Sequence, residues 1–209
     1  MYFKTYNISY RLLLSFTFFF FSIFLSKSQI FYTQNGTNLP NPKPDTIYTK
    51  KGIYKGYDAI FGNLLVKENR SKNDSRLINL PVIKIPALNK NTNPPIFLLN
   101  GGPGISNIWE ENFPYFLLDS FDIIMVGYRG VDGTVKLDSK NFKKYIYKTE
   151  NPLNDENFHK MEEIWKQEIT ELNEKHELSC YTITQVCQDI KTICRIFNYS
   201  KINFYAFSY

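Results

Sequence analysis

The sequence predicts an α/β fold in which a mostly parallel sheet is flanked by helices. Short apolar runs, typical of strands buried on both faces, alternate with segments in which apolar residues recur at helical spacing. Two of these runs also pass directly into turns of small residues, at 100–104 and 206–208. Open α/β sheets place their functional sites at such strand ends. We therefore expect one domain whose chemistry lies at these turns.

The first 28 residues have the layout of a secretory signal peptide. Lys4 and Arg11 precede an apolar stretch, 12–25, which is interrupted only by Ser and Thr. Ser26 and Ser28 are the small residues expected before a cleavage site. The stretch is shorter than the roughly 20 apolar residues of a membrane span. We expect cleavage after Ser28 and a secreted or periplasmic mature chain, with membrane attachment only through an uncleaved signal segment.

The composition is that of a globular protein with an ordinary surface. Hydrophobic residues make up 43% of the 209 residues, enough for one domain with a sizeable core. The net charge of +5 comes from scattered lysines, without a clustered basic face or a nucleic-acid-binding motif, so no nucleic-acid partner is expected. The histidines and cysteines lack metal-ligand spacing, and no cofactor is expected. Cys187 and Cys194 fall on one face of a predicted helix, too far apart for a disulfide, and are interpreted as small core residues.

The mature chain divides into a leader and one folded unit. Residues 29–56 predict an extended leader, because three prolines lie close together between Leu39 and Pro44. Residues 57–209 predict one domain with a helical insertion at 135–180, which could form part of a lid.

Five strands and two long helices are expected in the folded unit. Ile78, Leu80 and Val82 alternate along one strand, and Pro81 places it near an edge or a bulge. Thr182 stands where the cap of the last helix is expected. The predicted strands are 59–66, 77–85, 95–99, 122–126 and 204–207, and the predicted helices are 157–176 and 182–198, with a helical turn at 113–118.

The turn after the last strand carries a candidate nucleophile, Ser208. A sharp strand-to-helix turn lifts a serine hydroxyl off the sheet, where an imidazole can reach it. Such a turn needs small residues on both sides of the serine, and Ala206 is the first of them. Taken alone, Ala-x-Ser at a strand end is a weak signal.

The glycine-rich turn at 101–104 is a candidate oxyanion loop. Glycines after a buried strand let backbone N–H groups approach a ligand closely. In proteins whose nucleophile stands on such a strand-to-helix turn, one oxyanion donor comes from an earlier loop of this kind and the other from the residue after the nucleophile. The candidates are therefore Gly101 or Gly102 and Tyr209. A plain tight turn is the alternative.

A third turn, 128–134, also follows a buried strand, and we interpret its Arg129 as paired with a carboxylate. His159 and His176 both precede Ser208 and fall in the helical insertion. We interpret both histidines as solvent-facing helix residues outside any catalytic triad.

Four blocks of sequence occur in a telling order. They are NGGPGIS at 100–106, GYRGVDGT at 127–134, CYTITQVCQDI at 180–190 and INFYAFSY at 202–209. Together they resemble the oxyanion loop, Arg-Gly loop, helix and nucleophile elbow of the exported proline iminopeptidase and tripeptidyl aminopeptidase family of α/β-hydrolases. GNLLVKENR at 62–70 is similar to the first strand of that family, so the resemblance covers 57–209. Asn100, Gly127 and Ala206 depart from the usual histidine, aspartate and glycine.

The resemblance implies an α/β-hydrolase fold that is incomplete, truncated at the nucleophile elbow. It also implies a secreted serine peptidase, an aminopeptidase that acts on a peptide substrate through Ser208. The acid and histidine follow the serine in that fold. We therefore expect both beyond residue 209, and expect this fragment alone to be inactive.

Two alternatives remain open: an esterase or lipase on the same fold with a small ester substrate, and a non-catalytic relic or binding module. Carboxylates in the insertion could bind the free amine of a peptide, but a solvated helix face is the preferred interpretation. These residues are Glu162, Glu163, Glu168, Glu171, Glu174 and Glu177.

Overall fold

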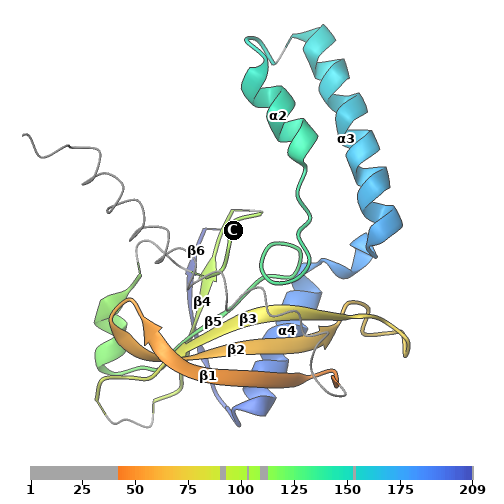
Figure 1. Ribbon diagram of the computed structural model, residues 1–209. Coiled ribbons are helices and arrows are strands. Elements are labelled where there is room, and N and C mark those ends of the chain that lie inside the picture. The colour runs from red at the N-terminus through yellow and green to blue at the C-terminus, as the bar shows by residue number, and fades with distance from the viewer. Residues whose placement is uncertain (1–41, 90–92, 103, 109–112, 153, 209) are drawn as a thin grey trace, which may run out of the picture.

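A computed structural model describes residues 42–208 apart from 90–92, 103, 109–112 and 153. Its centre is a six-stranded sheet in the order β1-β2-β3-β5-β4-β6 (Figure 1). The strands are β1 (Thr46–Tyr54), β2 (Tyr57–Lys67), β3 (Leu77–Ile85), β4 (Ile96–Asn100), β5 (Ile123–Val126) and β6 (Asn203–Phe207). The predicted signal segment lies outside the described residues.

The sheet is mixed, which corrects the expectation of a mostly parallel one. β1 pairs antiparallel with β2, β2 with β3, and β3 with β5, whereas β4 pairs parallel with both β5 and β6. The chain therefore leaves β5 on one side of β4 and returns as β6 on the other. This is a topological switch point, and the carboxyl ends of β4, β5 and β6 are where an open α/β sheet binds its ligand.

Strand β1 lies inside the stretch that the sequence predicted to be an extended leader, so that prediction is wrong for its last part. β1 and β2 are joined by a two-residue turn, Lys55 (φ 51°) and Gly56 (φ 88°). Positive φ at both central residues is the geometry that matches the twist of a hairpin. Lys55-Gly56 is the local sequence feature that indicates this hairpin. The prediction of an extended leader rested instead on the prolines upstream of it.

Two core layers enclose the sheet, because successive side chains of each strand point to opposite faces. On one face, Leu98 and Met125 pack with Leu118, which belongs to the 3-10 helix η2 (Tyr115–Asp119). On the other face, Phe97 and Ile124 pack with residues of α4 (Ile183–Ile196).

Helix α4 anchors the face of the sheet nearest the switch point. Ile190 and Ile193 are buried against the sheet. The predicted cap is present, since Thr182 Oγ1 accepts a hydrogen bond from the Gln185 N–H. Cys187 is exposed, contrary to the expectation of a core residue.

The predicted insertion contains α2 (Lys140–Lys148), α3 (Asp155–Lys175) and the short η3 (Leu178–Cys180). α2 and α3 form an antiparallel pair, here called the arm, which projects away from the sheet (Figure 1). Phe142 and Trp165 stack across it with ring centroids 5.2 Å apart. Glu168 is buried and accepts from the N–H groups of Asn141 and Phe142 at the start of α2.

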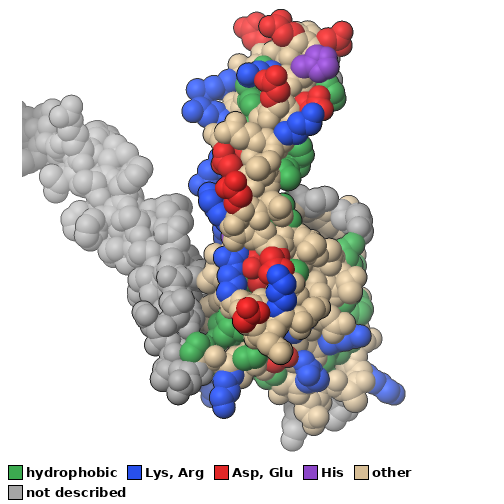
Figure 2. Space-filling model, turned by 90° about the vertical axis from the view of Figure 1, so that its right-hand side faces the viewer, with side chains coloured by type: hydrophobic (Ala, Val, Ile, Leu, Met, Phe, Trp, Pro, Cys, Tyr) green, Lys and Arg blue, Asp and Glu red, His purple; other side chains and the backbone are tan. Residues whose placement is uncertain are grey.

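Acidic and basic side chains alternate over the outer surface of the arm in Figure 2. Among residues 42–208, as far as they are described, no helix has the length and apolar character needed to cross a bilayer.

Candidate active site

The loop after β4 is held in a conformation that requires glycine. Gly102 has φ +80°, and its carbonyl accepts a hydrogen bond from the Ile105 N–H at 3.0 Å. A Cβ at Gly102 would lie 2.6 Å from Ile105 Cδ1 as well as in a backbone region that disfavours side chains. The candidate oxyanion loop is therefore a tight turn at the carboxyl end of a central strand.

A buried asparagine fixes where this loop begins. Asn107 Oδ1 accepts from the Asn100 N–H at 2.7 Å. Its Nδ2 donates to the carbonyls of Leu98 (3.1 Å) and Val126 (2.8 Å), which lie on β4 and β5. One amide side chain thus satisfies main-chain groups of two neighbouring strands at the point where both strands end.

Asp132 links the turn after β5 to the same loop. Its carboxylate accepts from Ser106 Oγ at 2.6 Å, the Asn107 N–H at 3.0 Å and the Tyr128 N–H at 2.8 Å. Asp132 is 6% exposed, and three donors offset the cost of burying its charge. The carboxylate therefore joins the turn after β5 to the loop after β4.

Two of the three positions at which the sequence differs from the blocks it resembles have structural explanations. Tyr128 Oη donates to the Asn100 carbonyl at 2.9 Å, and Asn100 Nδ2 donates to the Ser106 carbonyl. Both the main chain and the side chain of Asn100 are therefore hydrogen-bonded within the site. Burial raises the pKa of Tyr128, which keeps this hydroxyl protonated. At Gly127 a Cβ would lie 2.6 Å from both Asp132 Cβ and Pro81 Cγ, so the chain has no room for a side chain there.

Ser208 follows β6 directly and has φ +57°, in the left-handed region. A non-glycine residue in this region is uncommon and strained, and a strained serine at a strand end is the geometry of a nucleophile elbow. β6 aligns with β4 so that Ala206 pairs with Leu99 and Phe207 with Asn100. The serine therefore emerges at the level of the glycine loop.

Ser208 and Gly102 line one cavity of 470 Å³. Tyr128 and Asn100 supply its polar wall, and apolar residues supply most of the rest. The other lining residues are Leu99, Gly104, Ile183, Val186, Cys187, Ile190, Phe204, Ala206 and Phe207. The structure thus brings together the predicted nucleophile and one predicted oxyanion residue.

The remaining predicted site residues have other positions. Gly101 lies in the loop but not among the residues that line the cavity, and Tyr209 lies outside the described residues. His159 is on the arm with a side chain 76% exposed, as expected. His176 at the base of the arm has a side chain only 16% exposed, which corrects the expectation that it faces solvent. Neither histidine lines the cavity with Ser208. Within the described part of the chain, no cluster of three His, Cys, Asp or Glu could hold a metal.

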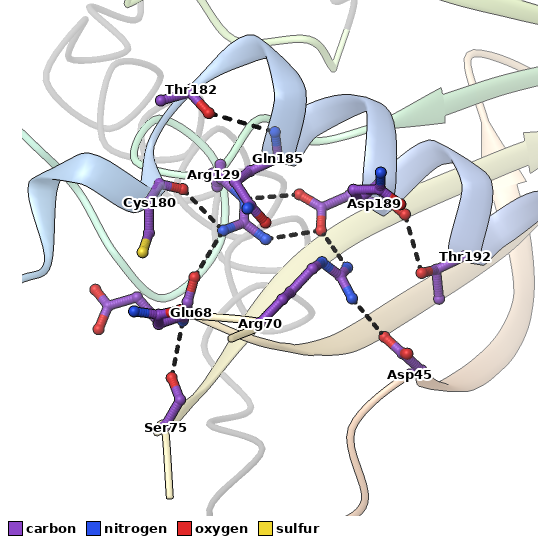
Figure 3. Close-up of polar contacts among 12 residues, drawn as sticks. Asp45, Glu68, Arg70, Ser75, Arg129, Cys180, Thr182, Gln185, Asp189 and Thr192 are labelled. Atoms are coloured by element: carbon purple, nitrogen blue, oxygen red, sulfur yellow. Dashed lines mark hydrogen bonds and ion pairs between the residues drawn. The ribbon is translucent and has the colours of Figure 1, made fainter. Parts of the chain in front are cut away.

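Arg129 is paired with a carboxylate, as the sequence analysis predicted. Its side chain is buried, and Nε and Nη2 each donate to Asp189 at 2.8 Å (Figure 3). Nη1 donates to the carbonyls of Glu68 and Cys180 at 2.9 Å. Arg129 therefore joins the turn after β5 to helix α4 and to the base of the arm. Its guanidinium is not available to a substrate.

A family model for the alpha/beta hydrolase fold matches residues 94–209, more than half of the chain. The chain therefore belongs to the α/β-hydrolase fold family, and the partial α/β sheet described above fits that assignment. A search of curated proteins gives no significant match.

Asn107 and Asp132 are the main contributors to the site that sequence reasoning missed. Both stand inside or beside the recognised blocks. Asn107 bonds to main-chain groups of β4 and β5, whereas Asp132 accepts from N–H groups of two different loops. The local signal in the sequence is a polar residue next to a glycine turn. This signal does not reveal which main-chain groups the side chain will bond to.

Proposed function

We propose that this chain carries the nucleophile half of a secreted serine hydrolase, an aminopeptidase that removes residues from peptide N-termini. The fold supports a hydrolase. The observation that carries the proposal is the shared cavity of Ser208 and Gly102, with Ser208 in a strained conformation at the end of β6. The aminopeptidase part rests on the resemblance of the four sequence blocks to that family.

In this proposal Ser208 Oγ attacks the scissile carbonyl carbon and loses its proton to a histidine. The carbonyl oxygen becomes an oxyanion, which the N–H groups of Gly102 or Gly101 and of Tyr209 stabilise. The protonated histidine then donates to the leaving amine, which leaves an acyl-enzyme that water hydrolyses. No step needs a cofactor.

Neither histidine of the chain is placed to serve this role, because neither lines the cavity. We therefore propose that the general base and its orienting acid are supplied by residues following Tyr209. On this account the 209-residue chain alone does not turn over substrate. Sequencing the transcript past the Tyr209 codon tests this, and an immediate stop codon would favour a non-catalytic relic or binding module.

An esterase or lipase is the second candidate, and the lining of the cavity favours it. Among the described residues, the cavity is lined by no charged side chain that could bind a free amine. The carboxylates of the predicted insertion considered for that task lie elsewhere, and several have other partners. Glu163 and Glu162 pair with Lys160 and Lys166, and Glu177 pairs with Lys72.

A paired assay separates the two candidates. The polypeptide extended by the sequence that follows Tyr209 would be given an aminoacyl naphthylamide and a short-chain p-nitrophenyl ester. An aminopeptidase hydrolyses the naphthylamide, and this activity is lost when the α-amine of the substrate is acetylated. An esterase hydrolyses only the p-nitrophenyl ester. If the 209-residue chain alone gave a Ser208-dependent reaction with either substrate, the general base would not come from residues after Tyr209.

A further inference from the structure

The arm contacts the rest of the described chain chiefly at its base, where one cluster of charged residues holds it. Glu68 and Arg76 stand at the ends of β2 and β3, and His176 caps the C-terminus of α3. Arg76 Nε and Nη2 donate to the two carboxylate oxygens of Glu68 at 2.7 and 2.6 Å. Arg76 Nη2 also contacts His176 Nδ1.

His176 is the residue of this cluster that directly follows the arm, as the C-cap of α3. Its side chain is 16% exposed, and Nδ1 lies 3.6 Å from Glu68 Oε1. Its ring meets the Tyr181 ring edge to face at 6.3 Å, and Tyr181 Oη donates to Glu68. The contact with Arg76 requires a neutral imidazole, because a guanidinium can only donate and Nδ1 must accept.

Other charged groups also surround the base of the arm. Glu177 accepts from Asn69 Nδ2 at 2.6 Å and pairs with Lys72 at 3.0 Å. A cleft of 360 Å³ at this junction is lined by Glu68, Lys72, Asp74, Ser75, Arg76, Asn173, Glu174, Lys175, His176 and Glu177. Among the described residues, Arg76 is the cation in direct contact with the imidazole, and Glu68 is the one carboxylate within ion-pair distance of it.

We propose that the arm is a hinged element whose base is latched by the Arg76–His176 contact, and that protonation of His176 releases this latch. The arm is joined to the core by the chain on both sides of it. One connection follows the turn that contains Tyr128, and the other leads through η3 into α4. Both therefore continue into elements that line the Ser208 cavity, and release of the latch changes the freedom of the arm beside that cavity.

The sign of the pH dependence follows from the contacts. Burial and the neighbouring Arg76 lower the pKa of His176, and Glu68 opposes them. The latched form therefore binds a proton less readily than a released arm, whose imidazole has the ordinary value of 6.5. The latch holds above that value and weakens as the pH falls below it. Glu68 stays ionised in this range, because hydrogen bonds from Arg76 and Tyr181 outweigh burial and lower its pKa.

The test measures the distance between the arm and the core by double electron–electron resonance. Spin labels are placed on the exposed Cys187 of α4 and on Lys160→Cys of α3, with Cys180 and Cys194 replaced by alanine. We expect one narrow distance distribution at pH 8.0 and a shifted or broadened one at pH 5.5. Circular dichroism at both pH values checks that the fold is retained.

The two histidines of the chain provide a matched pair of variants. His176→Gln offers Arg76 an amide oxygen at every pH, so its distribution should stay narrow at pH 5.5. His159→Gln, on the exposed side of α3, should respond to pH as the unmodified chain does. Identical distributions at both pH values, a response that persists in His176→Gln, or loss of the fold at pH 5.5 would overturn the proposal.

Discussion

Arg129 and Asp189, 60 residues apart in sequence, form a buried bidentate ion pair that joins the turn after β5 to α4. Arg70 Nη2 also donates to Asp189 Oδ1 at 2.7 Å, and Nη1 of the same guanidinium pairs with Asp45 Oδ1 at 2.9 Å. The turn after β5, the loop between β2 and β3, and α4 thus meet at one carboxylate (Figure 3).

This arrangement makes Asp189 more costly to remove than a surface acid. Asp189→Leu leaves the buried guanidinium of Arg129 without its counter-charge, and we expect a loss of about 3–5 kcal/mol in the free energy of unfolding. Urea denaturation measures it. Arg129→Met combined with Asp189→Leu should recover part of the loss, and strictly additive single effects would contradict the pairing.

Asn107 is predicted to be the residue on which the glycine loop depends most. Asn107→Ala leaves the Asn100 N–H and two strand carbonyls without partners, and each buried unsatisfied group costs about 1–3 kcal/mol. Amide hydrogen exchange should accelerate at Asn100. The exposed Asn173→Ala in α3 is the control, and equal protection of Asn100 in both variants would refute the role given to Asn107.

Two glycines with the same backbone conformation are predicted to differ in their tolerance of alanine. Gly133 has φ +84°, and a Cβ there would lie 1.8 Å from the Asn79 carbonyl oxygen. Gly104 has φ +86° and open space around it. Gly104→Ala should cost only the conformational strain of about 1–2 kcal/mol. Gly133→Ala should cost clearly more in thermal unfolding, because β3 or the turn must also move. Equal losses would contradict this packing.

Glu68 is predicted to stabilise the fold only above acidic pH. Burial would raise its pKa, but hydrogen bonds from Arg76 and Tyr181 outweigh this and lower it from 4.5. A carboxyl with a lowered pKa contributes stability that is lost as the pH falls through the folded-state value. Unfolding of Glu68→Gln should therefore depend less on pH below 4.5 than that of the unmodified chain. Parallel pH profiles would exclude this contribution.

The central strands and α4 could be predicted from sequence because each has a local signature. β3 was predicted at its observed bounds from alternating apolar residues, and the helix from Thr182 onward from its cap and apolar stripe. Pairing was less accessible. The antiparallel partnership of β3 and β5 depends on contacts between segments that local patterns do not connect.

The candidate site was predictable only in part for the same reason. The glycine turn and the serine are written in contiguous residues, so Gly102 and Ser208 could be named from the sequence. Asn107 acts by hydrogen bonds to carbonyls of β4 and β5, and Asp132 joins two loops that are 25 residues apart in sequence. A single sequence does not encode those partners as a pattern. Glu168 was likewise expected on a solvated face, yet it is buried because it caps α2.

The most direct test of the central claim is the rate of substrate hydrolysis by the polypeptide extended past Tyr209, measured for Ser208→Ala and for Ser200→Ala. Ser200 is an exposed serine just before β6 and serves as the control. The account predicts that Ser208→Ala lowers kcat by several orders of magnitude, while Ser200→Ala leaves it unchanged. Undiminished hydrolysis by a folded Ser208→Ala variant would show that Ser208 is not the nucleophile.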